Sequence, residues 1–388
     1  MFKSDRFFIN LYVQNHSRNM SGKNLHSEPF SEETITKLEI FEAYAREWLP
    51  TFIMSGAKMV YIFDLFAGTG YDKAGVSGST IRILTEIKNQ IGRVFQKKTK
   101  VHVYINEYDK KKFTQLKEAC ETFLAENPEL GRAGVELHYY NENFEVLYDK
   151  LESYIGKVPS LVYLDQNGVK FTSDKYFLGI AKKPTTDFLY YISSSYITRF
   201  GDTPEFRKVL QVDMKEVRKQ PYKYVHQTIL NYLRHKLPPD SKVKLYPFTI
   251  KKHTNVYGIV FGASHVRAVD KFLKTAWAVN DVNGLANFDI DDDASKSQGV
   301  LFGEQPLTKI EAFKQNLKRK ILSGEIKTNH AAYLYTIEEG HIGTHALDAI
   351  KEMRKEGLIT YNAKSPKVNY ESAIQKGEVV TFHIIDRQ

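Results

Sequence analysis

The alternation of strand and helix patterns between residues 59 and 192 constrains the fold more than any other feature of the sequence. Short apolar runs predict five strands, at residues 59–66, 100–106, 135–140, 160–164 and 187–192. The segments between them repeat apolar residues at helical spacing and predict four helices, at residues 79–91, 109–124, 144–155 and 173–181. This alternation is typical of a parallel sheet covered by helices on both faces. We therefore expect an α/β fold.

The end of this sheet is predicted to differ from its beginning. Two more strands are expected at residues 244–250 and 255–261, and only residues 251–254 connect them. A parallel crossover needs about a dozen residues or more, so these two strands must form an antiparallel hairpin. A parallel sheet closed by an antiparallel hairpin is typical of the Rossmann-like methyltransferase fold and is absent from ordinary dinucleotide-binding folds.

The tail of the chain has a different pattern. Helices are predicted at residues 309–323, 331–339 and 344–356, and strands follow at 358–361 and 379–385. A helix-turn-helix followed by a β-hairpin is the outline of a winged helix. We divide the chain accordingly into an N-terminal arm at 1–30, a methyltransferase-like domain at 31–280 with a helical insertion at 203–237, a linker at 281–307, and a winged-helix-like domain at 308–388.

Composition excludes several classes of protein. The single cysteine, Cys120, rules out a disulfide framework within the chain and a multi-cysteine metal site. No apolar run reaches the roughly 18–20 residues needed to cross a bilayer, and residues 1–17 lack the pattern of a signal peptide. We expect a cytoplasmic protein without membrane contact. The histidines are scattered, His138 on a predicted strand is interpreted as a core residue, and no metal site is predicted.

The positive charge is concentrated in one segment. Residues 207–252 contain twelve Lys and Arg residues and three acids, so this segment alone carries a charge equal to the net +9 of the chain. Basic segments attract polyanions, of which nucleic acid is the most common. The alternative is a solvated helix face with nothing bound. The candidate nucleic-acid-binding residues here are Arg207, Lys208, Lys215, Arg218, Lys219, Lys223, Arg234, Lys251 and Lys252.

A glycine-containing turn follows the first predicted strand and has the sequence Asp-Leu-Phe-Ala-Gly-Thr-Gly. Open α/β sheets bind ligands at the carboxyl ends of their strands, where glycine lets the backbone approach a ligand closely. The turn differs from the dinucleotide fingerprint because Lys73 occupies the third glycine position, and no Walker A motif is present. It resembles motif I of S-adenosylmethionine-dependent methyltransferases. The resemblance implies that the acidic residue faces the methionine part of the cofactor and the glycines pass its adenosine. The candidate residues are Asp64, Phe66, Ala67, Gly68 and Gly70; a purely structural turn is the alternative.

The next two strand ends carry matching residues. Glu107 follows the second predicted strand, and an acid at that position can accept hydrogen bonds from both ribose hydroxyls of an adenosine. Asn143 and Phe144 follow the third strand, where such folds hold the adenine ring. We therefore expect these three residues to complete a cofactor site with the glycine turn.

The fourth strand ends in Asp165 and raises the question of catalysis. Methyltransferases that act on the amines of bases carry an Asp/Asn-Pro-Pro-aromatic motif at this position, and its ring stacks on a flipped base. Here Asp165 is followed by Gln166 and Asn167, without the prolines or the aromatic residue. Asp165 could orient a substrate amine or act as a base. It could equally cap the strand end and bind the next loop.

Several segments together resemble one family. The segments TKLEIFEAYAREWLP, YIFDLFAGTG, SGST, LDQNGV, DFLYYIS and YGIVFGASH are similar to those of the three-Cys-motif partner proteins, which are bacterial and phage-associated and have a methyltransferase-like fold. The resemblance covers residues 25–280 and fits the tail as well. That family usually has Asp-Pro-Phe-Gly after the fourth strand, whereas this chain has Gln166 and Asn167 between Asp165 and Gly168. The resemblance implies S-adenosylmethionine as cofactor and a protein partner with three cysteines of the radical-S-adenosylmethionine type.

The predicted winged helix adds a second candidate nucleic-acid surface. Residues 344–355 would form the recognition helix, and Lys351, Arg354 and Lys355 on it could contact phosphates. A winged helix can also dock proteins. Two hypotheses follow for the chain: a methyltransferase-like protein that acts with its partner on nucleic acid, or a catalytically inactive adaptor that recruits the partner to nucleic acid.

Overall fold

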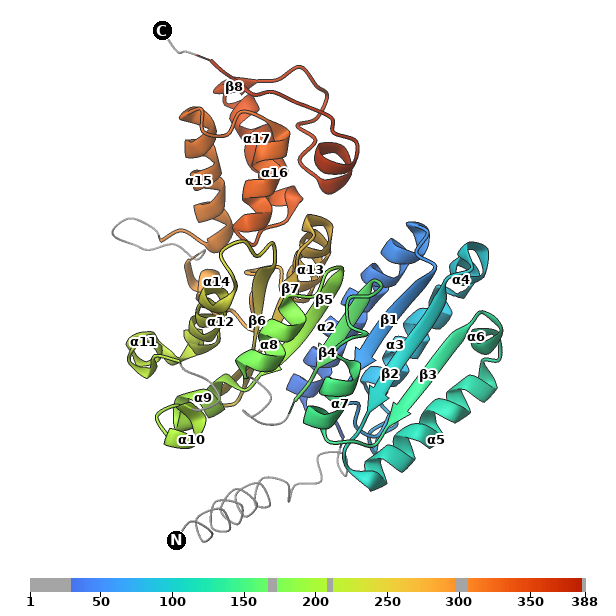
Figure 1. The fold of residues 1–388 in the computed structure, drawn as a ribbon. Coiled ribbons are helices and arrows are strands. Elements are labelled where there is room, and N and C mark those ends of the chain that lie inside the picture. Colours follow the sequence, from blue (N-terminus) through green and yellow to red (C-terminus); the bar gives the residue numbers. More distant parts are fainter. Residues whose placement is uncertain (1–28, 167–172, 208–211, 297–305, 386–388) are drawn as a thin grey trace.

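The computed structural model describes residues 29–166, 173–207, 212–296 and 306–385. Its centre is a mostly parallel seven-stranded sheet with the order β3-β2-β1-β4-β5-β7-β6 (Figure 1). β5 pairs with β7 antiparallel, and β7 pairs with β6 antiparallel, so the predicted hairpin is confirmed. The strands are β1 (Met59–Asp64), β2 (Lys100–Asn106), β3 (Val135–Tyr140), β4 (Ser160–Leu164), β5 (Thr186–Ile192), β6 (Lys244–Lys252) and β7 (Asn255–Ala263).

Helices cover both faces of this sheet. The helices of one face are α2 (Glu32–Met54), α3 (Ser79–Asn89), α4 (Ile91–Lys97), α5 (Lys110–Glu126) and α13 (Val266–Val279). The other face carries α7 (Phe144–Leu151), α8 (Asp174–Ala181), α9 (Ser194–Phe200), α11 (Met214–Lys219) and α12 (Val225–Lys236). Short elements complete the domain: α6 (Glu129–Arg132), α10 (Pro204–Arg207), the 3₁₀ turn Tyr222–Tyr224 and α14 (Asp293–Lys296).

Two hydrophobic cores result because strand side chains alternate between the faces. On β1, Ile62 belongs to the core under α2 and Phe63 to the core under α7. Both faces of the central strands are therefore apolar, which explains their nearly continuous hydrophobic runs. The strand predictions succeeded for this reason.

The structure differs from the sequence-based expectations in some helices. α4 and α9 were not predicted, because each is only seven residues long and too short for a clear period. α2 contains Pro50 and runs on to Met54, with Ile53 of its last turn fully buried. Part of the expected linker packs against the sheet: the amide of Thr249 on β6 donates to Leu285 O, and Asn287 N donates to Thr249 O.

The C-terminal part contains α15 (Lys309–Leu322), α16 (Asn329–Glu338), α17 (Gly343–Lys355), β8 (Ile359–Thr360), a π-helical turn (Glu371–Gln375) and β9 (His383–Ile384). β8 and β9 pair antiparallel, as the winged-helix prediction requires. α15 begins with a capping box in which the hydroxyl of Thr308 accepts from Glu311 N and the carboxylate of Glu311 binds the Thr308 backbone. Figure 1 shows this part beyond one end of the sheet, whereas the loops after β1 and β2 lie at the opposite end.

Candidate functional site

The site is built at the edge where β1, β2, β3 and β4 end. Asp64, the last residue of β1, has no exposed surface, and its Oδ2 accepts hydrogen bonds from Ser79 Oγ at 2.6 Å and Thr80 Oγ1 at 2.7 Å. Its Oδ1 is buried without a partner. Burial raises the pKa of Asp64 to about 6, although the two hydroxyls oppose this shift. One oxygen of this carboxylate thus has no hydrogen-bond partner within the described protein.

The glycine turn after β1 depends on backbone conformations that favour glycine. Gly68 and Gly70 have φ angles of 69° and 86°, in the left-handed region. A Cβ at Gly70 would lie 2.8 Å from Ala119 Cβ on α5, so a larger residue cannot fit without displacing the helix. Ala67 N donates to Asn106 O at 2.9 Å, which ties the turn to the end of β2.

Glu107 faces this turn, as the sequence predicts. Its Oε2 accepts from Gly68 N at 3.0 Å and its Oε1 from Asp109 N at 2.8 Å. Asn141 Nδ2 donates to Glu107 O at 2.7 Å and fixes the backbone of the strand end. Burial raises the pKa of the Glu107 carboxyl above its ordinary value. The glycine turn and the acid of the next strand are therefore in direct contact.

Asn143 and Phe144 lie near the same edge of the sheet. The side chain of Asn143 caps a helix, however, and that of Phe144 is buried in the core. Asn143 Oδ1 accepts from Glu145 N at 2.9 Å and caps the start of α7. Phe144 is 2% exposed and packs against Phe66, with 4.9 Å between the ring centroids. Almost none of the Phe144 ring is left for the adenine contact that the sequence predicts. Phe66 is only partly buried and is the ring closer to the surface.

Asp165 at the end of β4 is bound by a lysine from α2. Lys37 Nζ donates to both Asp165 oxygens at 2.7 Å and lies 4.0 Å from the centroid of the Tyr191 ring. The side chains of Lys37 and Asp165 are 8% and 18% exposed. Gln166 is also buried and donates to Tyr191 O at 3.1 Å. Asn167 and Gly168, which complete the predicted motif, lie outside the described residues.

The electrostatics of this edge favour a ligand with positive charge. After burial, repulsion from the negative charges of Asp165 and Glu107 adds to the raised pKa of Asp64, although Lys37 balances the charge of Asp165. A cation with hydrogen-bond donors would relieve that repulsion and could bind the partnerless Asp64 Oδ1.

Lys37 is the site residue that the sequence analysis missed. The sequence nevertheless contains a signal that Lys37 is buried. Along α2, Lys37 is followed by Phe41, Tyr44 and Trp48 at spacings of four, three and four, which place all four residues on one face of the helix. The three aromatic residues are fully or almost fully buried. A lysine on the buried face of a helix is expected to have an acidic partner, because lysines are rarely buried without one.

Much of the positive charge of the basic segment 207–252 is neutralised, because acids from outside the segment form ion pairs with its lysines and arginines. Asp202 pairs with both Arg207 and Arg218. Further pairs join Lys223 to Asp292, Lys252 to Glu33, Lys236 to Asp174 and Lys244 to Glu338.

The remaining candidate residues of this segment differ in their contacts. Lys219 pairs with Glu216, and Arg234 donates to Leu245 O at 2.6 Å. Lys251 lies over the ring of Phe288, and Lys215 is exposed. Lys208 lies outside the described residues. Among the described residues of the segment, most of the candidate side chains are therefore already paired, hydrogen-bonded or packed on a ring.

The opposite holds at the end of α17, where two acids are paired with lysines of α15. Glu352 binds Lys314 of α15 at 2.9 Å, and Glu356 binds Lys318 at 2.6 Å. Lys351 and Lys355 are exposed. Arg354 lies over the Tyr361 ring at 4.4 Å and donates to Ala363 O. The end of the candidate recognition helix thus presents two lysines and an arginine, while Glu352 and the adjoining Glu356 pair with α15.

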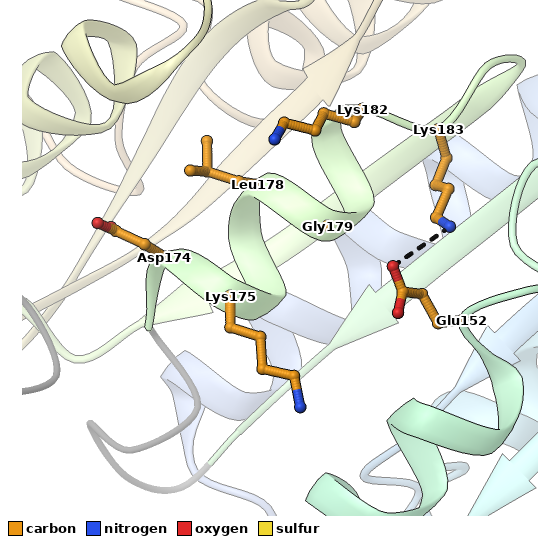
Figure 2. Close-up of a pocket in the computed structure, with 7 residues that line it drawn as sticks. All are labelled: Glu152, Asp174, Lys175, Leu178, Gly179, Lys182 and Lys183. Atoms are coloured by element: carbon orange, nitrogen blue, oxygen red, sulfur yellow. Dashed lines mark ion pairs between the residues drawn. The ribbon is translucent and has the colours of Figure 1, made fainter.

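A pocket of about 480 Å³ lies elsewhere, on the outer side of α8 (Figure 2). It is lined by Glu152, Asp174, Lys175, Leu178, Gly179, Lys182 and Lys183. Lys183 pairs with Glu152 at 3.4 Å, and Lys175 and Lys182 extend along the same helix. None of these residues belongs to the strand-end site.

Comparison with known proteins identifies the tail of the chain. Residues 287–366 match a family model described as the GMT-like wHTH domain. The match covers α15 to α17 and β8, so the C-terminal part is a winged-helix-like domain. It begins within the expected linker. Among the curated proteins, none matched the chain.

In the described part of the chain, no helix combines the length and hydropathy that a bilayer crossing requires.

Proposed function

We propose that the strand-end site binds S-adenosylmethionine and that the chain is a methyltransferase-like protein that acts with a three-cysteine partner on nucleic acid. The observation that carries the cofactor proposal is the contact of Glu107 with the glycine turn, next to the partnerless Oδ1 of Asp64. A mostly parallel sheet closed by an antiparallel hairpin is the arrangement expected of a Rossmann-like methyltransferase fold. The partner comes from the family resemblance alone.

The residues present fit this cofactor. Glu107 would accept from the ribose hydroxyls, and Asp64 Oδ1 would accept from the ammonium group of the methionine part. Gly68 and Gly70 keep side chains out of the path of the adenosine. The carboxylates of Asp64 and Glu107 suit a cofactor with positive charge, because opposite charge within a few ångströms stabilises their ionised forms. When bound, the cofactor supplies a methyl group on a positively charged sulfur.

Whether the protein itself takes part in catalysis depends on Lys37 and Asp165. An acceptor amine would be oriented by Asp165 only if Lys37 released at least one of its two oxygens. The chain would then contribute by placing the acceptor in line with the methyl group, which is the main source of rate in such transfers. The intact ion pair favours the second candidate, an adaptor that binds cofactor without transferring the methyl group.

Nucleic acid is proposed on account of the winged-helix-like domain. The exposed Lys351 and Lys355 of α17 suit phosphate contacts, and the neighbouring Glu352 and Glu356 are neutralised by lysines of α15. Figure 1 places α17 at the end of the sheet away from the strand-end site. A nucleic acid that contacts α17 must therefore extend along the molecule to reach Asp165.

The cofactor proposal is tested by equilibrium dialysis with labelled S-adenosylmethionine. Glu107→Gln should weaken binding about tenfold or more, since a charged acceptor contributes about 1.5–3 kcal/mol. Glu118→Gln, an exposed acid on α5, is the matched control and should bind as the original chain does. Equal affinities for all three proteins would reject the site.

Catalysis is tested by transfer of a labelled methyl group to mixed cellular nucleic acids, with and without the three-cysteine partner. Transfer that is lost in Asp165→Ala supports an enzyme with Asp165 at the acceptor. Transfer that is unchanged in this variant removes Asp165 from the mechanism. Cofactor binding without transfer, even with the partner present, supports the adaptor.

A further inference from the structure

A cluster outside the strand-end site brings together His102 of β2 and Glu136 and His138 of β3. One ligand atom from each residue lies within 4.8 Å of the other two. His102 Nδ1 is 2.9 Å from His138 Nε2 and 3.6 Å from Glu136 Oε2. Two imidazole nitrogens and one carboxylate oxygen thus lie close together.

The sheet itself causes this convergence. β2 and β3 pair in parallel, with His102 opposite Glu136 and Tyr104 opposite His138. Residues two apart on a strand point to the same face, so Glu136 and His138 share the face of His102. Because all three residues stand on paired strands, their spacing is fixed before any ligand arrives.

Aromatic neighbours hold the two imidazoles. The ring of Tyr104 stacks on His138 with 4.6 Å between centroids, and Tyr61 meets His102 edge-on at 5.5 Å. The side chain of His102 is 12% exposed, whereas that of Glu136 is 50% exposed. The cluster therefore has an ordered inner side and an outer side that is open to water and to an entering ion.

We propose that His102, Glu136 and His138 form a binding site for a divalent transition-metal ion, with Zn²⁺ the best-fitting ion. Imidazole nitrogens with one carboxylate are a common ligand set for zinc, whereas calcium and magnesium prefer oxygen ligands alone. Three protein ligands leave the fourth tetrahedral position to water on the open side. Binding replaces the His102–His138 hydrogen bond, and the imidazole that donated it carries its proton on its other ring nitrogen, so that both ligand nitrogens offer an electron pair to the metal.

The geometry requires only a small adjustment. In a tetrahedral site with zinc–nitrogen bonds of about 2.0–2.1 Å, the two nitrogens stand roughly 3.3 Å apart. The present separation of 2.9 Å reaches that value by slight rotation of the imidazoles. The carboxylate of Glu136 is already 3.6 Å from His102 Nδ1.

The cluster lies away from the strand-end site. The metal would join β2 to β3, which is the edge strand of the sheet. Glu107 lies five residues along β2, or roughly 16 Å at the rise of a strand, so the metal would not contact the strand-end site. The metal proposal therefore does not depend on the proposed function.

The test is a zinc titration of the full chain after removal of metal by a chelator, in competition with a chromogenic zinc indicator. The original chain should hold one Zn²⁺ that His138→Gln and Glu136→Gln each weaken at least tenfold. His330→Gln changes an exposed histidine on α16 and should leave this affinity unchanged. No binding by the original chain, or equal binding by all four proteins, would overturn the proposal.

Melting curves separate metal binding from misfolding. Zn²⁺ should raise the melting temperature of the original chain and leave that of the two cluster variants unchanged, because only the ligated state gains binding free energy. Glu136→Gln changes a half-exposed side chain, so it should fold even if His138→Gln does not. An equal rise in folded Glu136→Gln and in the original chain would show that zinc binds elsewhere.

Discussion

Asp64 combines three properties that a ligand-binding carboxylate at a strand end requires. It is fully buried, one of its oxygens is held by Ser79 and Thr80, and the other has no partner. Burial without a counter-ion favours the protonated acid, which raises its pKa to about 6. The side chain is therefore mostly ionised at pH 7.5 and mostly protonated at pH 5.

This titration predicts a pH dependence of binding. The ionised carboxylate binds a cationic ligand, and protonation below its pKa removes the charge, so affinity for S-adenosylmethionine should fall as the pH decreases from 7.5 to 5. Asp64→Asn should bind weakly throughout and lose most of this dependence. Isothermal titration at the two pH values measures the effect. If the ratio of the affinities at pH 7.5 and pH 5 were the same in Asp64→Asn as in the original chain, the pH dependence would belong to another group.

Gly258 on β7 shows a second constraint at the residue scale. A Cβ at this position would lie 2.2 Å from His226 Nε2, and the buried His226 ring also binds Ser194 and Ile259 O. Gly258→Ala should therefore lower the free energy of unfolding by about 1–3 kcal/mol, as overpacked cores do. Gly92→Ala on α4, where a Cβ meets nothing within 4 Å, is the matched control. Urea unfolding compares the two, and equal stabilities would refute the predicted clash.

At the scale of elements, α2 is the helix that locks the strand-end edge. Lys37 on α2 binds Asp165 after β4, and Glu33 binds Lys252 at the end of β6. Tyr44 in the middle of the helix donates to the buried Asp187 of β5 at 2.7 Å. One helix thus contacts three strands of the sheet.

The Lys37–Asp165 pair should couple strongly in a double-mutant cycle. Lys37→Met leaves an uncompensated, mostly buried carboxylate, which costs about 3 kcal/mol in comparable sites. Asp165→Asn in the same chain should recover part of that loss, because no charge is then left unpaired. Urea unfolding of the four proteins gives the coupling energy. Additive effects would mean that the ion pair does not hold α2 to β4.

The strands were predictable from the sequence, whereas the pairing of Lys37 was not. Buried strands produce local apolar runs, and β2, β3 and β4 begin and end where those runs do. Lys37 and Asp165 are separated by 128 positions, and only the assembled sheet brings them together. The glycine turn and Glu107 were predictable because both follow strand ends, and parallel strands end at one edge.

At the scale of the whole molecule, the winged-helix-like domain is packed onto the sheet domain. Trp277 Nε1 on α13 donates to Gly340 O at 2.9 Å, and Tyr246 Oη on β6 donates to Ile337 O at 2.9 Å. Lys309 Nζ donates to Asn283 O and lies 4.9 Å from the Trp277 ring centroid. Side chains of both parts share one hydrophobic core.

Acid should loosen this contact. Burial, with Lys309 nearby, lowers the pKa of both His341 and His345, and these side chains lie against Trp277. In the packed state, the pKa values of these two histidines lie below that of an exposed histidine. As the pH falls from 7 to 5, a molecule in which the two parts have separated therefore binds more protons, and acid favours this separated state. Hydrogen exchange, corrected for intrinsic rates, should show α16 losing protection before α7. Equal loss in both helices would refute a weakened contact.

The central claim is that the edge formed by Asp64, the glycine turn and Glu107 holds one molecule of S-adenosylmethionine. Isothermal titration of the intact chain with this compound at pH 7.5 measures it most directly. The account predicts saturable binding at one molecule per chain. Absence of detectable binding by the folded protein would contradict it.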